Sequence, residues 1–361
     1  MAEISMDTIA SKLVGQRVML VGGAGFIGHN LAIGLRKLGI DTLVADNLMV
    51  NNLVDLTYGT TGGKELEPLR HALYLDFINQ RFELMRDAGV IFRNVDARNF
   101  LDLSKCFDEF QPTTIIHLSA IASAVEAKKD PGLAFDLQLV TLRNILELCR
   151  KADDRSTQVI TMSSSTIYGD FETDIVDEST RPRPVGIYAN TKYMAERLIR
   201  TYNYQHGIAA CIIRPSALYG ERCISGRVSQ AFIENALFGK PLLLEGGGGG
   251  MLDFTSIENL VEGIIRAIAI SEKGGSTTYN LTFGNARSIA ELAAIVKDVV
   301  PSAVLEERPR AKDKPIRGTL STVRAEDELG FKADLPLEVG YRRYCEWYVE
   351  NFERVKSKIG A

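Results

Sequence analysis

Short apolar runs alternate with segments of helical periodicity through the first 219 residues. The apolar runs have the length of β-strands and fall at 17–22, 41–46, 90–96, 113–119, 157–165 and 208–215. Between them, apolar positions recur at helical spacing in 26–38, 76–89, 99–110, 131–152 and 188–207. Continuous apolar strands that alternate with helices are typical of a parallel sheet covered on both faces. The pattern therefore predicts an α/β fold built on a Rossmann-type, doubly wound parallel sheet.

The periodicity changes after residue 219. Shorter helices are predicted at 226–239, 257–271 and 288–300, and a last helix at 337–353. We expect two domains: residues 1–219, with 251–273 returning to them, and a smaller C-terminal α/β domain of 220–250 and 274–361. The segment 47–75 has weak periodicity and is expected to form a long irregular connection.

Composition narrows the classes of function. The 361 residues include 42 Lys+Arg and 46 Asp+Glu, giving a net charge of −4, so no excess of positive charge favours nucleic acid. Apolar runs reach about ten residues, too short to cross a membrane, and the N-terminus has no signal-peptide pattern. The five cysteines are scattered, which indicates neither a disulfide framework nor a zinc site. We expect a cytoplasmic protein without nucleic-acid, membrane or metal binding.

A glycine-rich turn follows the first predicted strand. Gly22, Gly25 and Gly28 lie between this strand and the next helix, where a tight turn and free N–H groups can hold a pyrophosphate. Asp46 ends the second strand and can accept hydrogen bonds from an adenosine ribose. No arginine follows it, which favours NAD over NADP as the cofactor. Taken alone, the glycines could form a plain tight turn and Asp46 could be solvated.

A second pattern points to proton transfer. Tyr188 and Lys192 share one face of a predicted helix, so the lysine can stabilise a phenolate and lower the pKa of a phenol from about 10. The serines 163–165 end the fifth strand, at the sheet edge where ligands bind in α/β proteins. A surface Tyr–Lys pair and serines that cap the backbone are the ordinary alternatives.

These features together resemble the extended short-chain dehydrogenase/reductase family, and within it the nucleotide-sugar epimerases and dehydratases, such as the UDP-glucose 4-epimerase type. The resemblance rests on VGGAGFIG (21–28), DNL (46–48), VDAR (95–98), HLSA (117–120), SSSTIYG (163–169), YANTK (188–192), RPSALYGER (214–222), LDFTSIENL (252–260), RAEDELGFK (324–332) and LEVGYRRYCEWY (337–348). The motifs occur in the family's order over almost the whole chain.

The resemblance implies roles for individual residues. The NAD-binding residues would be Gly22, Gly25, Phe26, Ile27, Gly28, Asp46, Asn47, Asp96, Ala97, Leu118, Ser119, Ala120, Tyr188 and Lys192. Tyr188 would be the base, and Lys192 would adjust its pKa. The catalytic hydroxyl of the family lies four residues before a Tyr-Gly pair, which makes Ser164 the candidate here. His117 is expected to be a buried core histidine rather than a catalytic one.

The family's branches differ next to the catalytic serine. Dehydratases carry an Asp-Glu pair there and decarboxylases a nearby Glu, whereas this chain has Ser165 and Thr166, which would line the sugar site. The resemblance therefore implies an NAD-dependent nucleotide-sugar epimerase that transiently oxidises the sugar, at C4, and returns the hydride to the opposite face. The alternative is a nucleotide-sugar dehydrogenase or reductase with net turnover of NAD(H).

The substrate and the assembly are also expectations from the resemblance. The family's diphosphate-binding arginine is replaced by Leu252, so Arg222, Arg227 and Arg310 are the candidates to bind a nucleotide-diphosphate sugar. The C-terminal domain would hold that nucleotide sugar. Family dimers pair the two helices that correspond to 131–152 and 188–206, so a homodimer is expected.

Overall fold

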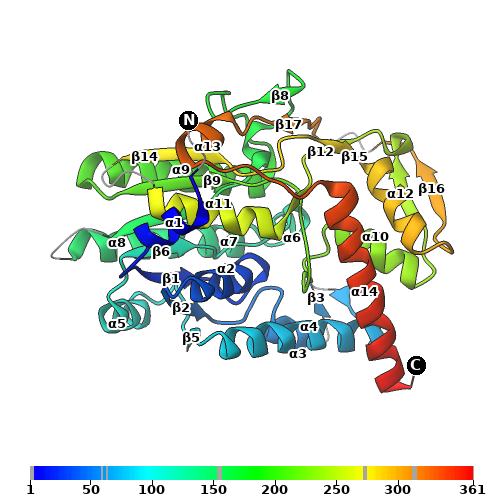
Figure 1. Cartoon of the computed structure of the whole chain (residues 1–361), viewed down its shortest axis with the longest axis horizontal. Helices are drawn as coiled ribbons and strands as arrows, with labels where there is room; N and C mark the ends of the chain where they lie inside the picture. The colour runs from blue at the N-terminus through cyan, green and yellow to red at the C-terminus, as the bar shows by residue number, and fades with distance from the viewer. Residues whose placement is uncertain are drawn as a thin grey trace.

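A parallel β-sheet forms the centre of the molecule. The computed structural model describes residues 4–57, 60–61, 64–152, 157–270, 275–310 and 315–360. Within them, seven parallel strands lie in the order β14-β9-β7-β6-β1-β2-β5 (Figure 1). They are β1 (Arg17–Val21), β2 (Asp41–Asp46), β5 (Ile91–Asn94), β6 (Thr114–His117), β7 (Gln158–Met162), β9 (Ala210–Arg214) and β14 (Ser276–Asn280). Because β1 lies between β2 and β6, the order of the strands reverses there, and ligands bind at such a point in α/β sheets.

Helices cover both faces of the sheet, which confirms the predicted fold class. One face carries α1 (Met6–Lys12), α2 (Phe26–Lys37), α11 (Ile257–Ile270) and α13 (Val323–Leu329). The other carries α5 (Phe100–Phe110), α8 (Thr141–Lys151) and α9 (Gly186–His206), with α6 (Ala124–Lys129) and α7 (Pro131–Phe135) packed against α9. The helix predicted over 131–152 is thus divided, because a π-helical turn, Asp136–Val140, separates α7 from α8.

A second hydrophobic core lies beside the carboxyl edge of the sheet. It joins α4 (Pro68–Asp87), α10 (Val228–Leu237), α12 (Ile289–Val299) and α14 (Leu337–Ile359) with the parallel pair β11 (Leu242–Glu245) and β16 (Leu305–Arg308). In Figure 1, α14 and α4 lie at the right and the bottom of the molecule, away from β14. Short pairs connect the loops: β10 (Leu218–Tyr219) with β13 (Thr255–Ser256), β12 (Met251–Leu252) with β15 (Arg287–Ser288), and β8 (Ile175–Val176) with β17 (Thr319–Leu320).

Two predicted segments need correction. The segment 47–75 is not an irregular connection throughout: it contains α3 (Leu53–Thr57), the hairpin of β3 (Thr60–Thr61) and β4 (Lys64–Glu65), and the start of α4, which begins at Pro68 rather than at 76. Residues 276–280 were expected in the smaller domain but pair with β9 in the main sheet. The strand was missed because its buried positions include Thr278 and Asn280, which break the apolar pattern.

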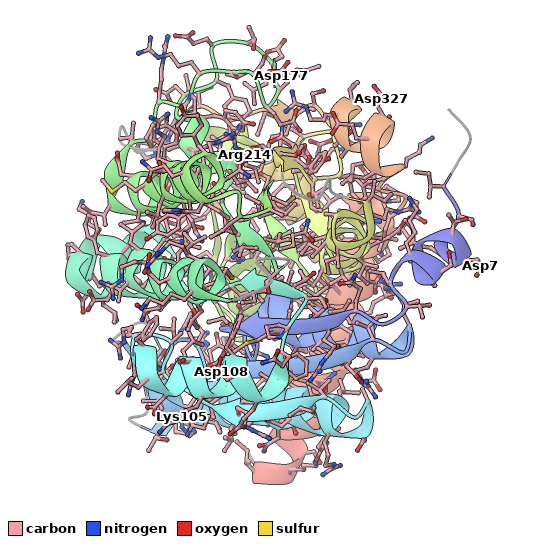
Figure 2. All side chains as sticks on the ribbon, turned by 90° about the vertical axis from the view of Figure 1, so that its left-hand side faces the viewer. Asp7, Lys105, Asp108, Asp177, Arg214 and Asp327 are labelled. Atoms are coloured by element: carbon pink, nitrogen blue, oxygen red, sulfur yellow. The ribbon has the colours of Figure 1, made fainter. Side chains whose placement is uncertain are left out.

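Charge is mostly kept at the exterior. In Figure 2, Lys105 and Asp108 lie on α5 at the outside, whereas Arg214 lies in the interior. Arg214 pairs there with Glu196 of α9 at 2.7 Å, and both side chains are at most 3% exposed. No helix among the described residues is both long and apolar enough to cross a membrane.

Candidate active site

A cavity of about 400 Å³ opens at the carboxyl ends of β1, β6 and β7 and extends toward α10. This volume lies within the usual range for sites that bind small molecules. Most of the residues predicted from the sequence line it: Gly22, Gly25, Phe26, Ile27, Gly28, Asp46, Asn47, Leu118, Ser119, Ala120, Ser164, Ser165, Thr166, Tyr188, Lys192 and Arg227. The fold therefore brings together segments that are up to about 200 residues apart in the sequence.

The glycine-rich turn has the geometry that a phosphate cradle needs. Gly22 has a φ of +79°, and a Cβ there would stand 2.6 Å from the amide nitrogen of Ser119. A Cβ at Gly28 would lie 2.3 Å from the carbonyl oxygen of Gly23, so this glycine allows close packing of the turn. By contrast, a Cβ at Gly25 would meet no atom nearer than 3.8 Å. The open space beside Gly25 lets a ligand approach the main chain closely.

The start of α2 adds free hydrogen-bond donors to this cradle. Its N-cap, Gly25, provides no side-chain hydrogen bond, and the first turn of the helix contains no acidic residue. The N–H groups and the partial positive charge of a helix N-terminus are therefore available to a pyrophosphate. The residues present fit the diphosphate of a dinucleotide.

Asp46 is fixed at the end of β2 by backbone donors. Its carboxylate accepts hydrogen bonds from the amide nitrogens of Ala24 at 2.9 Å and Leu48 at 2.7 Å. Burial raises the pKa of Asp46, and the two backbone donors oppose this shift. The side chain thus links the glycine turn to the next loop, with its carboxylate at the cavity.

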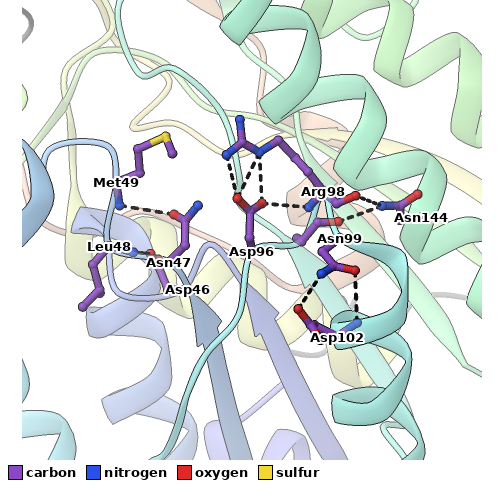
Figure 3. A network of polar contacts seen from close by, with 10 residues as sticks. Asp46, Asn47, Leu48, Met49, Asp96, Arg98, Asn99, Asp102 and Asn144 are labelled. Atoms are coloured by element: carbon purple, nitrogen blue, oxygen red, sulfur yellow. Dashed lines mark hydrogen bonds and ion pairs between the residues drawn. The ribbon is translucent and has the colours of Figure 1, made fainter.

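Asp96 and Ala97 lie at the next strand end, outside the lining of the main cavity. Figure 3 shows Asp96 bonded to Arg98, and this ion pair of 2.6 Å lowers the pKa of Asp96. The nearby Asn47 side chain contributes to the same lowering of the pKa of Asp96. On the other side, Asn144 of α8 donates to the carbonyl oxygens of Ala97 and Arg98. These contacts hold the turn beside the adenosine end of the predicted site.

Ser164, Tyr188 and Lys192 line the opposite end of the cavity. The Ser164 hydroxyl oxygen accepts hydrogen bonds from the backbone nitrogen and hydroxyl of Thr166 at 3.2 and 3.0 Å, which fixes its position. Lys192 Nζ donates to the carbonyl oxygen of Met162 at 2.8 Å and lies 5.9 Å from the centre of the Tyr188 ring.

The ammonium of Lys192 is held in a dry environment. Burial, together with the charge of Arg227, lowers the pKa of Lys192 to about 7. A buried cation beside the phenol gains from a nearby negative charge, because water no longer screens the interaction. The arrangement can therefore stabilise a phenolate on Tyr188 and support general base catalysis.

Two of the three arginines predicted to bind substrate, Arg222 and Arg310, are not in the lining of this cavity. Arg222 pairs with Glu221 at 2.9 Å and lies over the ring of Trp347, outside the cavity lining. Arg310 is exposed and donates to the carbonyl oxygen of Pro315. Of the three, Arg227 is the one in the cavity lining; it is the N-cap residue of α10 and donates to the Ser225 hydroxyl oxygen.

Sequence reasoning missed two arginines that do line the cavity, Arg81 and Arg317. Arg81 lies on α4. The helix predicted over 76–89 includes Arg81, but nothing in the sequence marked it as a residue of the site. Arg317 precedes β17 and donates to the Ser165 hydroxyl oxygen at 2.5 Å, 152 positions away in the sequence. Neither belongs to a motif, so no local pattern could have identified it.

His117 has the buried position that was expected of a core histidine. Nε2 lies 2.8 Å from the Thr141 hydroxyl oxygen, and that hydroxyl donates onward to the carbonyl oxygen of Leu137. Nε2 therefore carries the proton, and Nδ1 accepts from Thr161. Among the described residues, no group of three or more potential metal ligands is found.

Comparisons with known proteins agree with this geometry. The model of the NAD-dependent epimerase/dehydratase family matches residues 18–282. UDP-glucuronate 4-epimerase 2 of Arabidopsis thaliana is 26% identical over 96% of this chain and 79% of its own length.

Two solved structures illustrate the similarity in three dimensions. The UDP-glucose 4-epimerase of Thermus thermophilus, in complex with NAD, has a TM-score of 0.74 and 25% identity, covering 92% of this chain and 99% of its own. The UDP-glucuronic acid 4-epimerase of Bacillus cereus, in complex with UDP-glucuronic acid and NAD, has a TM-score of 0.77 and 22% identity, covering 93% and 99%. The latter likeness shows the shared fold.

Proposed function

The chain belongs to the NAD-dependent epimerase/dehydratase family, with NAD as its cofactor, and we propose that it is an epimerase that inverts C4 of a nucleotide-diphosphate sugar. One observation carries the proposal. The cavity joins a dinucleotide cradle at Gly25 to the Tyr188–Lys192 pair, and among its described lining residues Asp46 at the far end is the sole carboxylate. A base is thus present at the sugar end, without the acid that a dehydratase places beside the catalytic serine.

The roles of the residues follow from their positions. NAD, when bound, supplies a hydride acceptor and donor. Tyr188 accepts the proton of the C4 hydroxyl, while Ser164 orients that hydroxyl and Lys192 stabilises the phenolate. When the ketone is reduced again from its opposite face, Tyr188 returns the proton to the oxygen. The net result is inversion of one carbon without net redox change.

Three segments would hold NAD. The turn at Gly22, Gly25 and Gly28 would bind the pyrophosphate, Asp46 and Asn47 the adenosine ribose, and Ser119 the part of the cavity toward the nicotinamide. Lys192 would also reach the nicotinamide ribose. Among the predicted arginines, Arg227 is the one that lines the cavity, so it is the proposed contact for the substrate diphosphate.

The product balance tests this function against its alternative. We expect the purified enzyme to interconvert C4-epimeric nucleotide sugars while free NADH stays at the background level. A dehydrogenase would instead reduce one NAD⁺ to NADH per turnover, and a reductase would oxidise one NADH. Stoichiometric NADH formation with a nucleotide sugar, without any epimer, would contradict the epimerase proposal.

We further propose that the enzyme is a cytoplasmic homodimer that pairs α8 and α9 with the same helices of a second copy. Met194 and Tyr204 of α9 are 42% and 90% exposed, which leaves apolar surface on this helix. Analytical ultracentrifugation is the direct test, and Tyr204→Asp should shift the distribution toward monomer. A wild-type protein that sediments as a monomer would contradict the dimer.

A further inference from the structure

A loop in front of β17 places a cation at the sugar end of the cavity. Arg317 lies between residues that are bonded to the segment 170–174: the Ile316 nitrogen donates to Asp170, and the Thr319 nitrogen donates to the carbonyl oxygen of Asp174 at 3.0 Å. A Cβ at Gly318 would stand 2.6 Å from that same carbonyl oxygen. The backbone on both sides of Arg317 is therefore fixed, and its side chain has a defined direction.

The guanidinium of Arg317, a partly buried residue, has few hydrogen-bond partners. Nη2 donates to the Ser165 hydroxyl oxygen, and the group lies 5.2 Å from the centre of the Phe171 ring. Nε is buried without a hydrogen-bond partner. Within the described part of the chain, no carboxylate forms an ion pair with Arg317. Arginine has five N–H donors, so most of its capacity is unused.

Such a group needs an anion. Burial lowers the pKa of Arg317 to about 10, so the side chain still carries its charge at neutral pH. The charge of Asp170 acts on Arg317 without forming an ion pair, and a partly buried cation is more favourable with a close partner of opposite sign. Because Arg317 lines the cavity, a ligand can supply that partner.

The position of Arg317 indicates which part of the ligand it meets. Its hydrogen-bond partner, Ser165, directly follows Ser164, and its charge acts on Tyr188. Arg317 is thus close to the reacting end of the sugar, whereas Arg227 is a separate cation for the diphosphate. A carboxylate at C6 lies two carbons from C4, within reach of a group that is placed beside Ser165.

We propose that Arg317, together with Ser165, binds a carboxylate on the sugar ring and makes the enzyme selective for a nucleotide-linked uronic acid over the neutral hexose. The proposal rests on the proposed function. Arginine suits this role because its planar fork can form two parallel hydrogen bonds with a carboxylate. Arg317 is then a specificity-determining residue, distinct from the Tyr188–Lys192 pair that transfers the proton.

The test compares UDP-glucuronic acid with UDP-glucose on the NAD-loaded enzyme. Arg317→Gln should lower kcat/KM for UDP-glucuronic acid about 10- to 100-fold, as expected for the loss of charged hydrogen bonds, mainly through KM. Because UDP-glucose has no carboxylate, the same variant should lower kcat/KM for this sugar clearly less, so that the ratio of kcat/KM for UDP-glucuronic acid to kcat/KM for UDP-glucose falls. Arg317→Lys should recover part of the loss. Arg308→Gln, an exposed arginine of β16, is the matched control and should behave like the wild type.

Binding measurements separate the possible failures. Calorimetry with each nucleotide sugar reports selectivity even if turnover is absent, and retained NAD and an unchanged melting temperature show that a variant is folded. Equal losses for both sugars in Arg317→Gln, or a wild type that prefers UDP-glucose, would overturn the role of Arg317. Selective binding of UDP-glucuronic acid without epimerisation would instead overturn the proposed function and leave the carboxylate site standing.

Discussion

Gly25→Ala should separate cofactor binding from folding. Gly25 has φ −76° and ψ −173°, which alanine adopts without strain, and the new methyl group would meet no atom within 3.8 Å. The unfolded chain loses entropy when glycine becomes alanine, whereas alanine is a poorer N-cap than glycine, so these opposing effects should keep the change in stability of the apo protein within about 1 kcal/mol. The methyl group would, however, stand beside the cavity where the pyrophosphate approaches the backbone.

The loss of NAD affinity can be estimated from the hydrogen bonds that a displaced phosphate gives up. A charged hydrogen bond contributes about 1.5–3 kcal/mol, so the loss of one at the start of α2 should raise the Kd for NAD about 10- to 150-fold. Chemical denaturation of the NAD-free protein measures the change in stability, and titration calorimetry with NAD measures the change in Kd.

Two other glycines provide the controls. Gly132→Ala on α7 has similar free space and lies outside the cavity lining, so its NAD affinity should equal that of the wild type. Gly22→Ala should lower stability itself, because φ is +79° and the Cβ would overlap the backbone of Ser119. If Gly25→Ala binds NAD with wild-type affinity, the glycine turn is not the phosphate cradle.

Three further predictions concern the base, the buried histidine and α4. Tyr188→Phe should retain NAD but lose at least about 100-fold in kcat, measured by product analysis; near-normal turnover would exclude Tyr188 as the base. Burial lowers the pKa of His117 to about 3. Below pH 6.5 the unfolded chain therefore binds a proton at this residue that the folded chain does not bind. The free energy of unfolding should fall as the pH is lowered, by up to about 1.4 kcal/mol per pH unit. Urea unfolding at pH 7 and pH 5 should show that His117→Gln reduces this loss, whereas equal losses in both proteins would contradict it. Arg81→Met should destabilise the fold by about 2–4 kcal/mol in the same assay, because it removes a cation that donates to backbone carbonyls. The control, Arg86→Met on the exposed side of α4, should change stability by less than about 0.5 kcal/mol. Equal effects of the two substitutions would contradict the role of Arg81.

The sequence was sufficient to predict six of the seven strands of the sheet and several residues of its carboxyl edge, because both depend on local patterns. The strands read as apolar runs, and Gly22, Asp46, Ser164 and Tyr188 lie within a few residues of strand ends or helix starts, where their neighbours in the sequence identify them. Their approach to one cavity then follows from the parallel topology, since all these strand ends meet at one edge.

What could not be predicted depends on contacts between distant segments. Helix α4 has little amphipathic character because it is contacted from several sides: Phe77 packs on Tyr348 of α14, while Arg81 reaches the loop at Arg222. A helix that is buried on more than one side loses the periodic signal on which prediction relies. Arg317 could not be predicted for a related reason: its place in the site depends on the contact with Ser165, which is distant in the sequence, and not on any neighbouring residue.

The long connection between β2 and β5 therefore serves the site rather than interrupting the fold. Arg81 donates to the carbonyl oxygens of Arg222 at 2.5 Å and of Ala24 and Asn51 at 3.5 and 3.4 Å, and so joins the glycine turn to two neighbouring loops. One and two helical turns earlier on the same helix, Phe77 contacts α14 and Tyr74 contacts α10, where Tyr74 donates to Glu234. Because one rigid helix makes both sets of contacts, the cofactor cradle and the core that supports α10 are held in a fixed relation. The cavity between them needs that fixed relation, since catalysis requires the reacting sugar carbon to stay within hydride-transfer distance of the cofactor.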